Sequence, residues 1–141
     1  MLRTMTVEDN LPFREMFKSH LLSDFPSMEV IEAANGEEAF KGLASYPIDL
    51  VFMDIRLPGE SGLELTKKIK ANYKDVTIAI LTSYDLPEYR EAAARCGADC
   101  YITKDSMKRD QISAMVKCFQ ISKDSIGLKP GCVRLASEGS H

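Results

Sequence analysis

A short stretch near the middle of the chain, residues 48–62, most constrains the fold. Its residues Leu50–Met53 are all apolar, which is typical of a strand buried on both faces of a parallel sheet. The apolar run stops at Asp54, and a proline and two glycines then indicate a turn before a helical pattern begins. A carboxylate therefore stands where a buried strand emerges, at the kind of sheet edge where ligands bind. Taken alone, Asp54 is more simply explained as a residue that closes a strand before a turn.

Short apolar runs alternate with amphipathic stretches along the rest of the chain. We expect strands at about residues 3–7, 28–33, 50–53, 76–81 and 100–103. Helices are expected from about Pro12 to a break at Pro26, from Gly36 to a point before Pro47, and at about 62–72, 87–96 and 107–121. The first of these would bury one apolar stripe, formed by Phe13, Met16, Phe17 and Leu21. This alternation with short loops predicts an α/β fold, a parallel sheet covered by helices on both faces. Residues 1–121 would form one domain, and residues 122–141 are expected to be a linker or tail, because a domain usually needs at least ~50 residues.

The composition excludes several classes of protein. Of the 141 residues, 45% are hydrophobic and 28% are charged, and the net charge of −3 gives no electrostatic basis for binding nucleic acid. No segment approaches the ~20 apolar residues of a membrane span, and the first residues lack the apolar core of a signal peptide. Because Cys96, Cys100, Cys118 and Cys132 lack zinc-site spacing, we expect reduced cysteines in a cytoplasmic protein.

Polar residues follow four of the predicted strands at their carboxyl ends. Glu8 and Asp9 follow the first strand, Asp54 the third, Thr82 the fourth and Lys104 the fifth. In a doubly wound sheet these ends converge on one edge. Each residue has an ordinary explanation by itself: a helix cap, a charge at a helix start, or a lysine reaching solvent. Their occurrence together, in this order, favours a functional site.

The chemistry of this set can be argued from its groups. Three clustered carboxylates repel one another and favour a hard cation with oxygen ligands, which Mg²⁺ fits best. A carboxylate beside a metal, a lysine and a hydroxyl is equipped to accept a phosphoryl group, because the two cations stabilise charge on the phosphoryl oxygens. Asp54 would be the nucleophile and form an acyl phosphate, and the Thr82 hydroxyl would hydrogen-bond a phosphoryl oxygen.

These residues resemble the response-regulator receiver domain of bacterial two-component signalling. The matching segments are the acidic pair Glu8–Asp9, residues 54–62, Thr82–Ser83, residues 97–99 and residues 101–104. The likeness covers about residues 3–121. It implies a flavodoxin-like, doubly wound (βα)5 fold, also called CheY-like, with a five-stranded parallel sheet of order 2-1-3-4-5.

The resemblance also implies roles for the polar residues. Asp9 and Asp54 would bind Mg²⁺ through their side chains, and Arg56 would add its backbone carbonyl. Glu8 would act through water, or directly as a longer carboxylate where the family usually has aspartate. Lys104 would contact Asp54, and then the phosphoryl group that a sensor histidine kinase transfers to Asp54.

A change of surface would carry the signal onward. By the resemblance, Thr82 and Tyr101 occupy the switch positions, and Tyr101 turns inward when Thr82 is drawn toward the phosphoryl group. The responding surface would comprise the helix at 87–96, the strand at 100–103 and the helix at 107–121. It would bind a partner or a second copy of the chain, through residues that include Tyr84, Leu86, Tyr89 and Arg90.

One departure from the family pattern refines the expectation. Asp105 follows Lys104 at a position where many receivers have proline. The Lys-Asp-Ser sequence is similar to receivers of the NarL/FixJ group, which precede a helix-turn-helix output domain. The chain would then be either a stand-alone regulator or a receiver excised from a DNA-binding transcriptional regulator, and it would not bind nucleic acid itself.

Two alternatives belong to other functional classes. A phosphatase-type enzyme would use Asp54 as a transient nucleophile, but many such enzymes carry a second acid two residues later, where this chain has Arg56. A degenerate receiver that serves only as a binding module would have lost an acid, the threonine or the lysine, and none is lost. We therefore expect a signalling domain that catalyses only its own phosphorylation and dephosphorylation.

Overall fold

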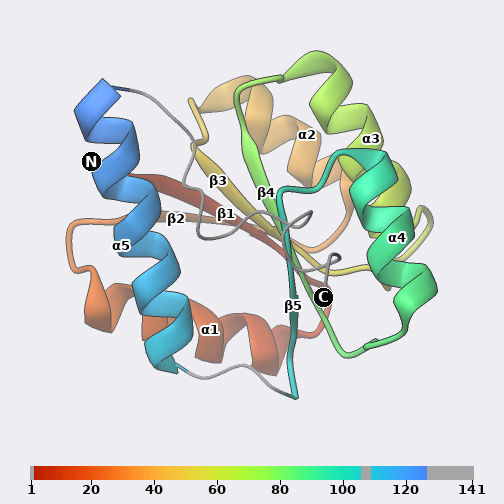
Figure 1. The fold of residues 1–141 in the computed structure, drawn as a ribbon, viewed down its shortest axis with the longest axis horizontal. Coiled ribbons are helices and arrows are strands. Elements are labelled where there is room, and N and C mark those ends of the chain that lie inside the picture. The colour runs from red at the N-terminus through yellow and green to blue at the C-terminus, as the bar shows by residue number, and fades with distance from the viewer. Residues whose placement is uncertain (1, 106–108, 127–141) are drawn as a thin grey trace.

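Strands and helices alternate along the whole described chain, residues 2–105 and 109–126 of a computed structural model (Figure 1). The strands are β1 (Arg3–Val7), β2 (Glu29–Ala33), β3 (Leu50–Met53), β4 (Thr77–Thr82) and β5 (Cys100–Thr103). The helices are α1 (Leu11–Asp24), α2 (Gly36–Ser45), α3 (Gly62–Asn72), α4 (Pro87–Cys96) and α5 (Arg109–Ile126). Every strand pairing is parallel, and the order β2-β1-β3-β4-β5 confirms the predicted topology.

Helices cover both faces of the sheet, as the continuous apolar run of β3 predicts. Val51 and Met53 pack into a core beneath α2, α3 and α4, whereas Leu50 and Phe52 pack into a second core beneath α1 and α5 (Figure 1). None of these four side chains is more than 2% exposed. Packing into both cores therefore holds β3 in position along the sheet, and so determines where Asp54 leaves the sheet.

Two predicted details differ from the structure. Met16 was expected on the buried stripe of the first helix, but it is 36% exposed, whereas Phe17 and Leu21 are buried. The contact face of α1 is narrow, and Met16 lies about 100° around the helix from Phe17. Helix α5 runs to Ile126, beyond the expected end at Ile121, because the sequence has no glycine or proline before Gly127. The expected start of this helix at Met107 lies outside the described residues.

Local signals in the sequence explain where the helices next to the site begin and end. The Asn10 side chain accepts a hydrogen bond from Phe13 N at 2.9 Å and so caps α1. Ser61 caps α3 by accepting from Leu63 N at 3.0 Å. Gly97 ends α4 with a left-handed φ of 100°, as its position in the sequence predicts.

The remaining expectations concern cysteines and membrane spans. Cys96 and Cys118 are free thiols, and the Cys100 thiol contacts the Met115 sulfur at 3.7 Å. Cys132 lies outside the described residues, as does the predicted tail from residue 127 onward. Within residues 2–105 and 109–126, no helix has the length and apolar character that crossing a membrane requires.

Candidate functional site

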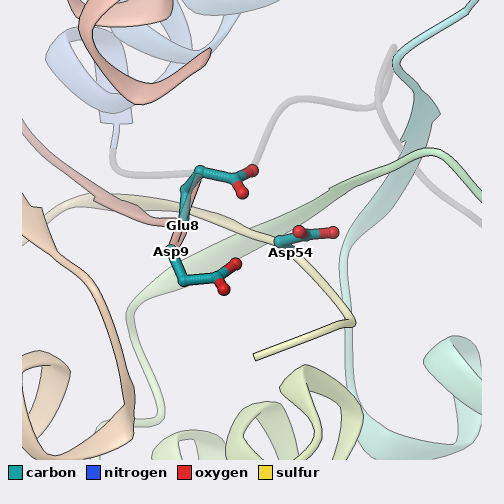
Figure 2. Close-up of side chains that lie close together, drawn as sticks. All are labelled: Glu8, Asp9 and Asp54. Atoms are coloured by element: carbon teal, nitrogen blue, oxygen red, sulfur yellow. The ribbon is translucent and has the colours of Figure 1, made fainter. Parts of the chain in front are cut away.

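Three carboxylates meet at the carboxyl ends of two neighbouring strands. Glu8 and Asp9 follow β1, and Asp54 follows β3, which pairs with β1. One oxygen from each of the three lies within 4.8 Å of the others, and Figure 2 shows the side chains grouped at this edge. Glu8 is 5% exposed and Asp54 is 7% exposed, whereas Asp9 is exposed to solvent. The predicted acidic cluster is therefore present, with one member open to solvent.

Backbone contacts fix the Asp54 carboxylate. Its own backbone N–H donates to Val7 O at 3.0 Å, which continues the pairing of β1 with β3 past the end of the strand. The Oδ1 atom accepts from Ile55 N at 2.8 Å, and the Oδ2 atom lies 3.6 Å from the Lys104 ammonium. One carboxylate oxygen is thus held by the loop, and the other faces a cation.

Lys104 contacts two of the three acids. Its ammonium lies 2.7 Å from Glu8 Oε1, closer than its 3.6 Å separation from Asp54 Oδ2. The Lys104 backbone N–H donates to Thr82 O at 2.7 Å, which ties the end of β5 to the end of β4. The sequence predicted the contact between Lys104 and Asp54, but it did not indicate that Glu8 would be the nearer partner.

The Glu8 carboxylate has donors on both oxygens. Oε1 accepts from Lys104, and Oε2 accepts from Asn10 N at 3.1 Å. Burial raises the pKa of Glu8 above its ordinary value; the hydrogen bond from Lys104 opposes this rise, and the negative charge of Asp54 adds to it. Among the three acids, Glu8 is therefore the one whose two carboxylate oxygens both accept hydrogen bonds from the protein.

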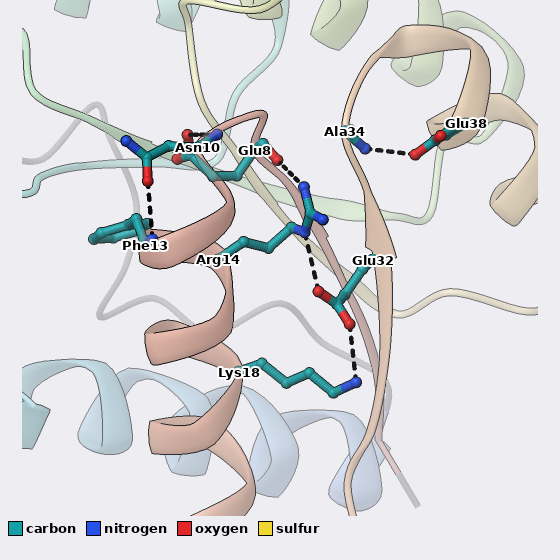
Figure 3. Close-up of polar contacts among 8 residues, drawn as sticks. All are labelled: Glu8, Asn10, Phe13, Arg14, Lys18, Glu32, Ala34 and Glu38. Carbon is teal, nitrogen blue, oxygen red and sulfur yellow. Dashed lines mark hydrogen bonds and ion pairs between the residues drawn. The ribbon is translucent and has the colours of Figure 1, made fainter.

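The first turn of α1 holds the backbone of Glu8 in place. Arg14 donates to Glu8 O at 2.7 Å and pairs with Glu32 of β2 at 3.0 Å (Figure 3). Lys18 pairs with the same Glu32 carboxylate at 2.9 Å. Sequence reasoning missed this network, although basic residues four apart on one helix face were a signal for it.

Thr82 is the last residue of β4, where it pairs with Thr103 of β5; we had expected it just after the strand. It is fully buried, and its hydroxyl has no hydrogen-bond partner in the described part of the chain. An unpaired buried hydroxyl is costly, and an oxygen of a bound ligand would satisfy it. This hydroxyl fits the predicted role of Thr82 toward a phosphoryl group.

Tyr101 is already turned into the protein. It is 4% exposed, its hydroxyl donates to Tyr84 O, and the Arg90 guanidinium lies over its ring at 4.7 Å. Burial raises the pKa of Tyr101 to about 12, while the positive charge of Arg90 opposes the rise. The ring therefore joins β5 to the loop before α4 and to α4 itself.

The other residues of the predicted partner surface lie around this ring. Tyr84 packs against Tyr89 with ring centroids 5.5 Å apart, and Leu86 is 47% exposed. The Arg56 guanidinium also lies over the Tyr84 ring, 5.0 Å from the ring centroid. Arg56 is the residue whose carbonyl was expected at the metal site, so this contact links the loop after β3 to the switch region.

Gly62 brings the loop after β3 back onto Asp54. Its N–H donates to Ile55 O at 2.8 Å. A Cβ atom at Gly62 would lie only 1.8 Å from Asp54 O, a backbone atom that cannot move aside. Position 62, which the sequence marks as part of a turn, thus requires glycine because its backbone lies against the backbone of Asp54, the candidate nucleophile.

The sequence of this chain is similar to a known protein family and to individual regulatory proteins. Residues 4–117 match the response regulator receiver domain. The oxygen regulatory protein NreC of Staphylococcus carnosus is 37% identical over 116 residues, which cover 81% of this chain and 53% of NreC. The response regulator UvrY of Escherichia coli is 31% identical over 116 residues, which cover 82% of this chain and 53% of UvrY. The chain spans about half the length of these curated relatives.

Solved structures show the same architecture. The response regulator protein TrrA of Thermotoga maritima, in complex with Mg²⁺ and BeF, is 38% identical with a TM-score of 0.72, and the match covers 83% of this chain and 97% of TrrA. A LuxR-family two-component response regulator of Aurantimonas is 28% identical with a TM-score of 0.76, over 99% of this chain and 98% of the other. The sequence match and the fold thus agree over the region that holds the acidic cluster.

Proposed function

Since this chain belongs to the response regulator receiver domain family, we propose that it accepts a phosphoryl group on Asp54 from a sensor histidine kinase. The observation that carries the proposal is the geometry around Asp54, whose Oδ2 atom faces the Lys104 ammonium at 3.6 Å within a cluster of three acids. Its remaining oxygen is fixed by a backbone N–H, so the nucleophile is oriented before any donor arrives.

In the proposed reaction, a carboxylate oxygen of Asp54 attacks the phosphorus of a phosphohistidine. A new O–P bond forms while the P–N bond breaks, and the imidazole nitrogen leaves with the bonding electrons. The Lys104 ammonium would stabilise the charge on the phosphoryl oxygens, and the Thr82 hydroxyl would hydrogen-bond one of them. We propose no catalytic activity beyond phosphorylation and dephosphorylation of the domain itself.

The residues at the acidic cluster fit Mg²⁺, because carboxylate and carbonyl oxygens are the ligands that this cation prefers. Asp9, Asp54 and the carbonyl of Arg56 would hold it. Glu8 would take part through water, since both its oxygens already accept hydrogen bonds from the protein. When bound, Mg²⁺ would neutralise charge on the transferring group.

We further propose that the modification alters the surface of α4, β5 and α5, through Thr82 and Tyr101. The contacts of Tyr101 with Tyr84 and Arg90 support this, because they join the end of β5 to α4. The surface would bind a second copy of the chain or an output domain. The output domain would be a DNA-binding domain in a cytoplasmic transcriptional regulator. The Lys-Asp-Ser sequence after β5 supports this, as do the relatives NreC and UvrY, which are about twice as long as the match. In this proposal the receiver domain is residues 1–121, with residues 122–126 prolonging its last helix.

Intact-mass measurement tests the proposal. The protein is incubated with Mg²⁺ and acetyl phosphate, alongside the variants Asp54→Asn and Asp75→Asn. Asp75 is an exposed acid just before β4, at the opposite end of the sheet, so its variant controls for the loss of one charge. We expect wild type and Asp75→Asn to gain one phosphoryl group and Asp54→Asn to gain none. An unchanged wild-type mass, or an equal gain in all three proteins, would contradict the proposal.

A further inference from the structure

The ring of Phe13, on the first turn of α1, lies against the ammonium of Lys104, with 4.1 Å between the nitrogen and the ring centroid. We propose that Phe13 is a positioning residue for Lys104, which uses its aromatic face to keep the ammonium beside Glu8 and Asp54. Insofar as it concerns phosphoryl transfer, this inference rests on the proposed function. The placement of the lysine itself does not.

Three groups surround the ammonium in this arrangement. Glu8 Oε1 lies 2.7 Å away, Asp54 Oδ2 lies 3.6 Å away, and the Phe13 ring covers a third side. The Lys104 side chain is only 15% exposed, so little water is left to compete with the ring for the charge. A cation over an aromatic face is stabilised more strongly as it is desolvated.

The Phe13 ring is itself held in place from several directions. The Phe13 backbone N–H donates to the cap residue Asn10, which fixes the first turn of α1 (Figure 3). The ring stacks on Phe17 with centroids 5.9 Å apart, and Phe17 packs edge-on against Phe52 of β3 at 4.9 Å. A row of three rings therefore connects β3, the strand that Asp54 follows, with the Lys104 ammonium.

The Phe13 ring can restrict the position of the Lys104 ammonium in a way that the two carboxylates cannot. A lysine side chain has a long flexible stem, and two acids on neighbouring strands offer its ammonium two competing positions. The neutral ring holds the cation without adding charge, so it narrows the range of positions that the ammonium can take beside the two acids. Phe13 thus acts on the reaction through Lys104 and need not contact the phosphoryl group.

The direct test is an NMR measurement of the Lys104 ε-CH₂ protons, which the ring current shifts upfield when they lie near an aromatic face. We compare wild type with Phe13→Leu, Phe13→Tyr and Phe25→Leu. Phe25 ends the same helix and packs into the same core, so its variant controls for loosening of that core. We expect the upfield shift in wild type, Phe13→Tyr and Phe25→Leu, and its loss in Phe13→Leu. Wild-type protons at ordinary lysine shifts, or an equal shift in Phe13→Leu, would overturn the inference.

A kinetic measurement connects the placement to the proposed reaction. With Mg²⁺ and acetyl phosphate, Phe13→Leu should gain its phosphoryl group about three- to tenfold more slowly than Phe25→Leu, as the size of a partly desolvated cation–π contact suggests. Equal rates in the two variants would overturn the positioning role. If the wild type takes up no phosphoryl group, the proposed function fails, while the NMR comparison still decides whether Phe13 places Lys104.

Discussion

Lys104 and Glu8, 96 positions apart in the sequence, are joined by a 2.7 Å hydrogen bond between an ammonium and a buried carboxylate. The bond connects the ends of β1 and β5, which are not neighbours in the sheet. It therefore closes the site across the intervening strands β3 and β4, and it makes Lys104 the main counter-charge of the acidic cluster.

Removing this cation should make stability depend on pH. In Lys104→Met, Glu8 and Asp54 would be close together without a counter-charge, so we expect the free energy of unfolding to fall by about 2–3 kcal/mol at pH 7. The pKa of Glu8 is already raised by burial, and losing Lys104 would raise it further. When the pKa of a carboxyl group is higher in the folded than in the unfolded state, its contribution to the free energy of unfolding is fully present below the unfolded-state pKa. That contribution is lost as pH rises through the folded-state pKa. The deficit should therefore shrink as pH falls toward 4.5, which urea unfolding at several pH values would measure.

A matched control for this experiment is Lys68→Met. Lys68 pairs with Glu60 at the surface, where its side chain is 56% exposed. Because exposed ion pairs contribute little, this variant should unfold like the wild type at every pH. The same pH dependence in both variants would show that the effect does not come from the buried cluster.

The metal site should need Asp9. A single carboxylate holds hydrated Mg²⁺ only weakly, and Asp9 is the exposed member of the cluster. We expect Mg²⁺ titration of Asp9→Asn by calorimetry to show clearly weaker binding than wild type. Asp75→Asn should bind as the wild type does. Unchanged affinity in Asp9→Asn would place the cation elsewhere.

The unpaired hydroxyl of Thr82 gives a prediction about stability and function together. Thr82→Val keeps the shape and removes a buried group without a partner, so the free energy of unfolding should stay the same or rise by up to about 1 kcal/mol. Phosphoryl uptake should nevertheless be slower. Thr66→Val is the comparison, because the Thr66 hydroxyl donates to Gly62 O at 2.8 Å and its loss should cost about 1 kcal/mol. A larger loss in Thr82→Val than in Thr66→Val would mean that the Thr82 hydroxyl is bonded in solution.

Gly62 should tolerate no side chain. Gly62→Ala would drive a Cβ into the Asp54 carbonyl, and we expect a loss of about 3 kcal/mol in the free energy of unfolding. Gly59 provides a control, because its φ of 83° is left-handed but no atom lies within 4 Å of its would-be Cβ. Gly59→Ala should lose only about 1 kcal/mol, from backbone strain alone. Equal losses would show that the close approach at Gly62 relaxes easily.

Amide hydrogen exchange with beryllofluoride, a phosphoryl mimic, would test the switch. We expect altered protection around Tyr89 and Tyr101 as well as in the loops after Asp9 and Asp54, because Tyr101 bonds to the Tyr84 carbonyl. A coupling of ordinary allosteric size, about 1–3 kcal/mol, would shift the population only in part. Changes confined to the two loops would rule out this route.

The sequence predicted the framework of the site because strand ends are marked locally. The apolar run before Asp54, and the polar residues after the other strands, required only periodicity and the geometry of a parallel sheet. Gly97 was likewise recognisable as a helix end from its position alone. These features depend on near neighbours in the chain, so a single sequence contains them.

The sequence could not predict which of several nearby side chains a given side chain would contact. Nothing in the order of residues indicates that Lys104 would approach Glu8 more closely than Asp54, because the choice depends on how far the lysine side chain reaches past β4 and β3. Phe13 appeared only as an apolar member of the helix stripe, since its contact with Lys104 joins segments that are far apart. Met16 was misplaced for a similar reason, as periodicity fixes the direction of a helix face better than its width.

The order of the strands along the chain also determines the order in which the residues of the candidate site are synthesised. In the order β2-β1-β3-β4-β5, the strands β4 and β5 stand one after the other on the same side of β3, in the order in which they are translated. The three acids are made within the first 54 residues, and Lys104 comes last. At elongation rates of about 5–20 residues per second, the segment between Asp54 and Lys104 takes roughly 3–10 s to make. During that interval the nascent chain has its acidic residues without their lysine, so the candidate site is completed only when the final strand is added to the sheet.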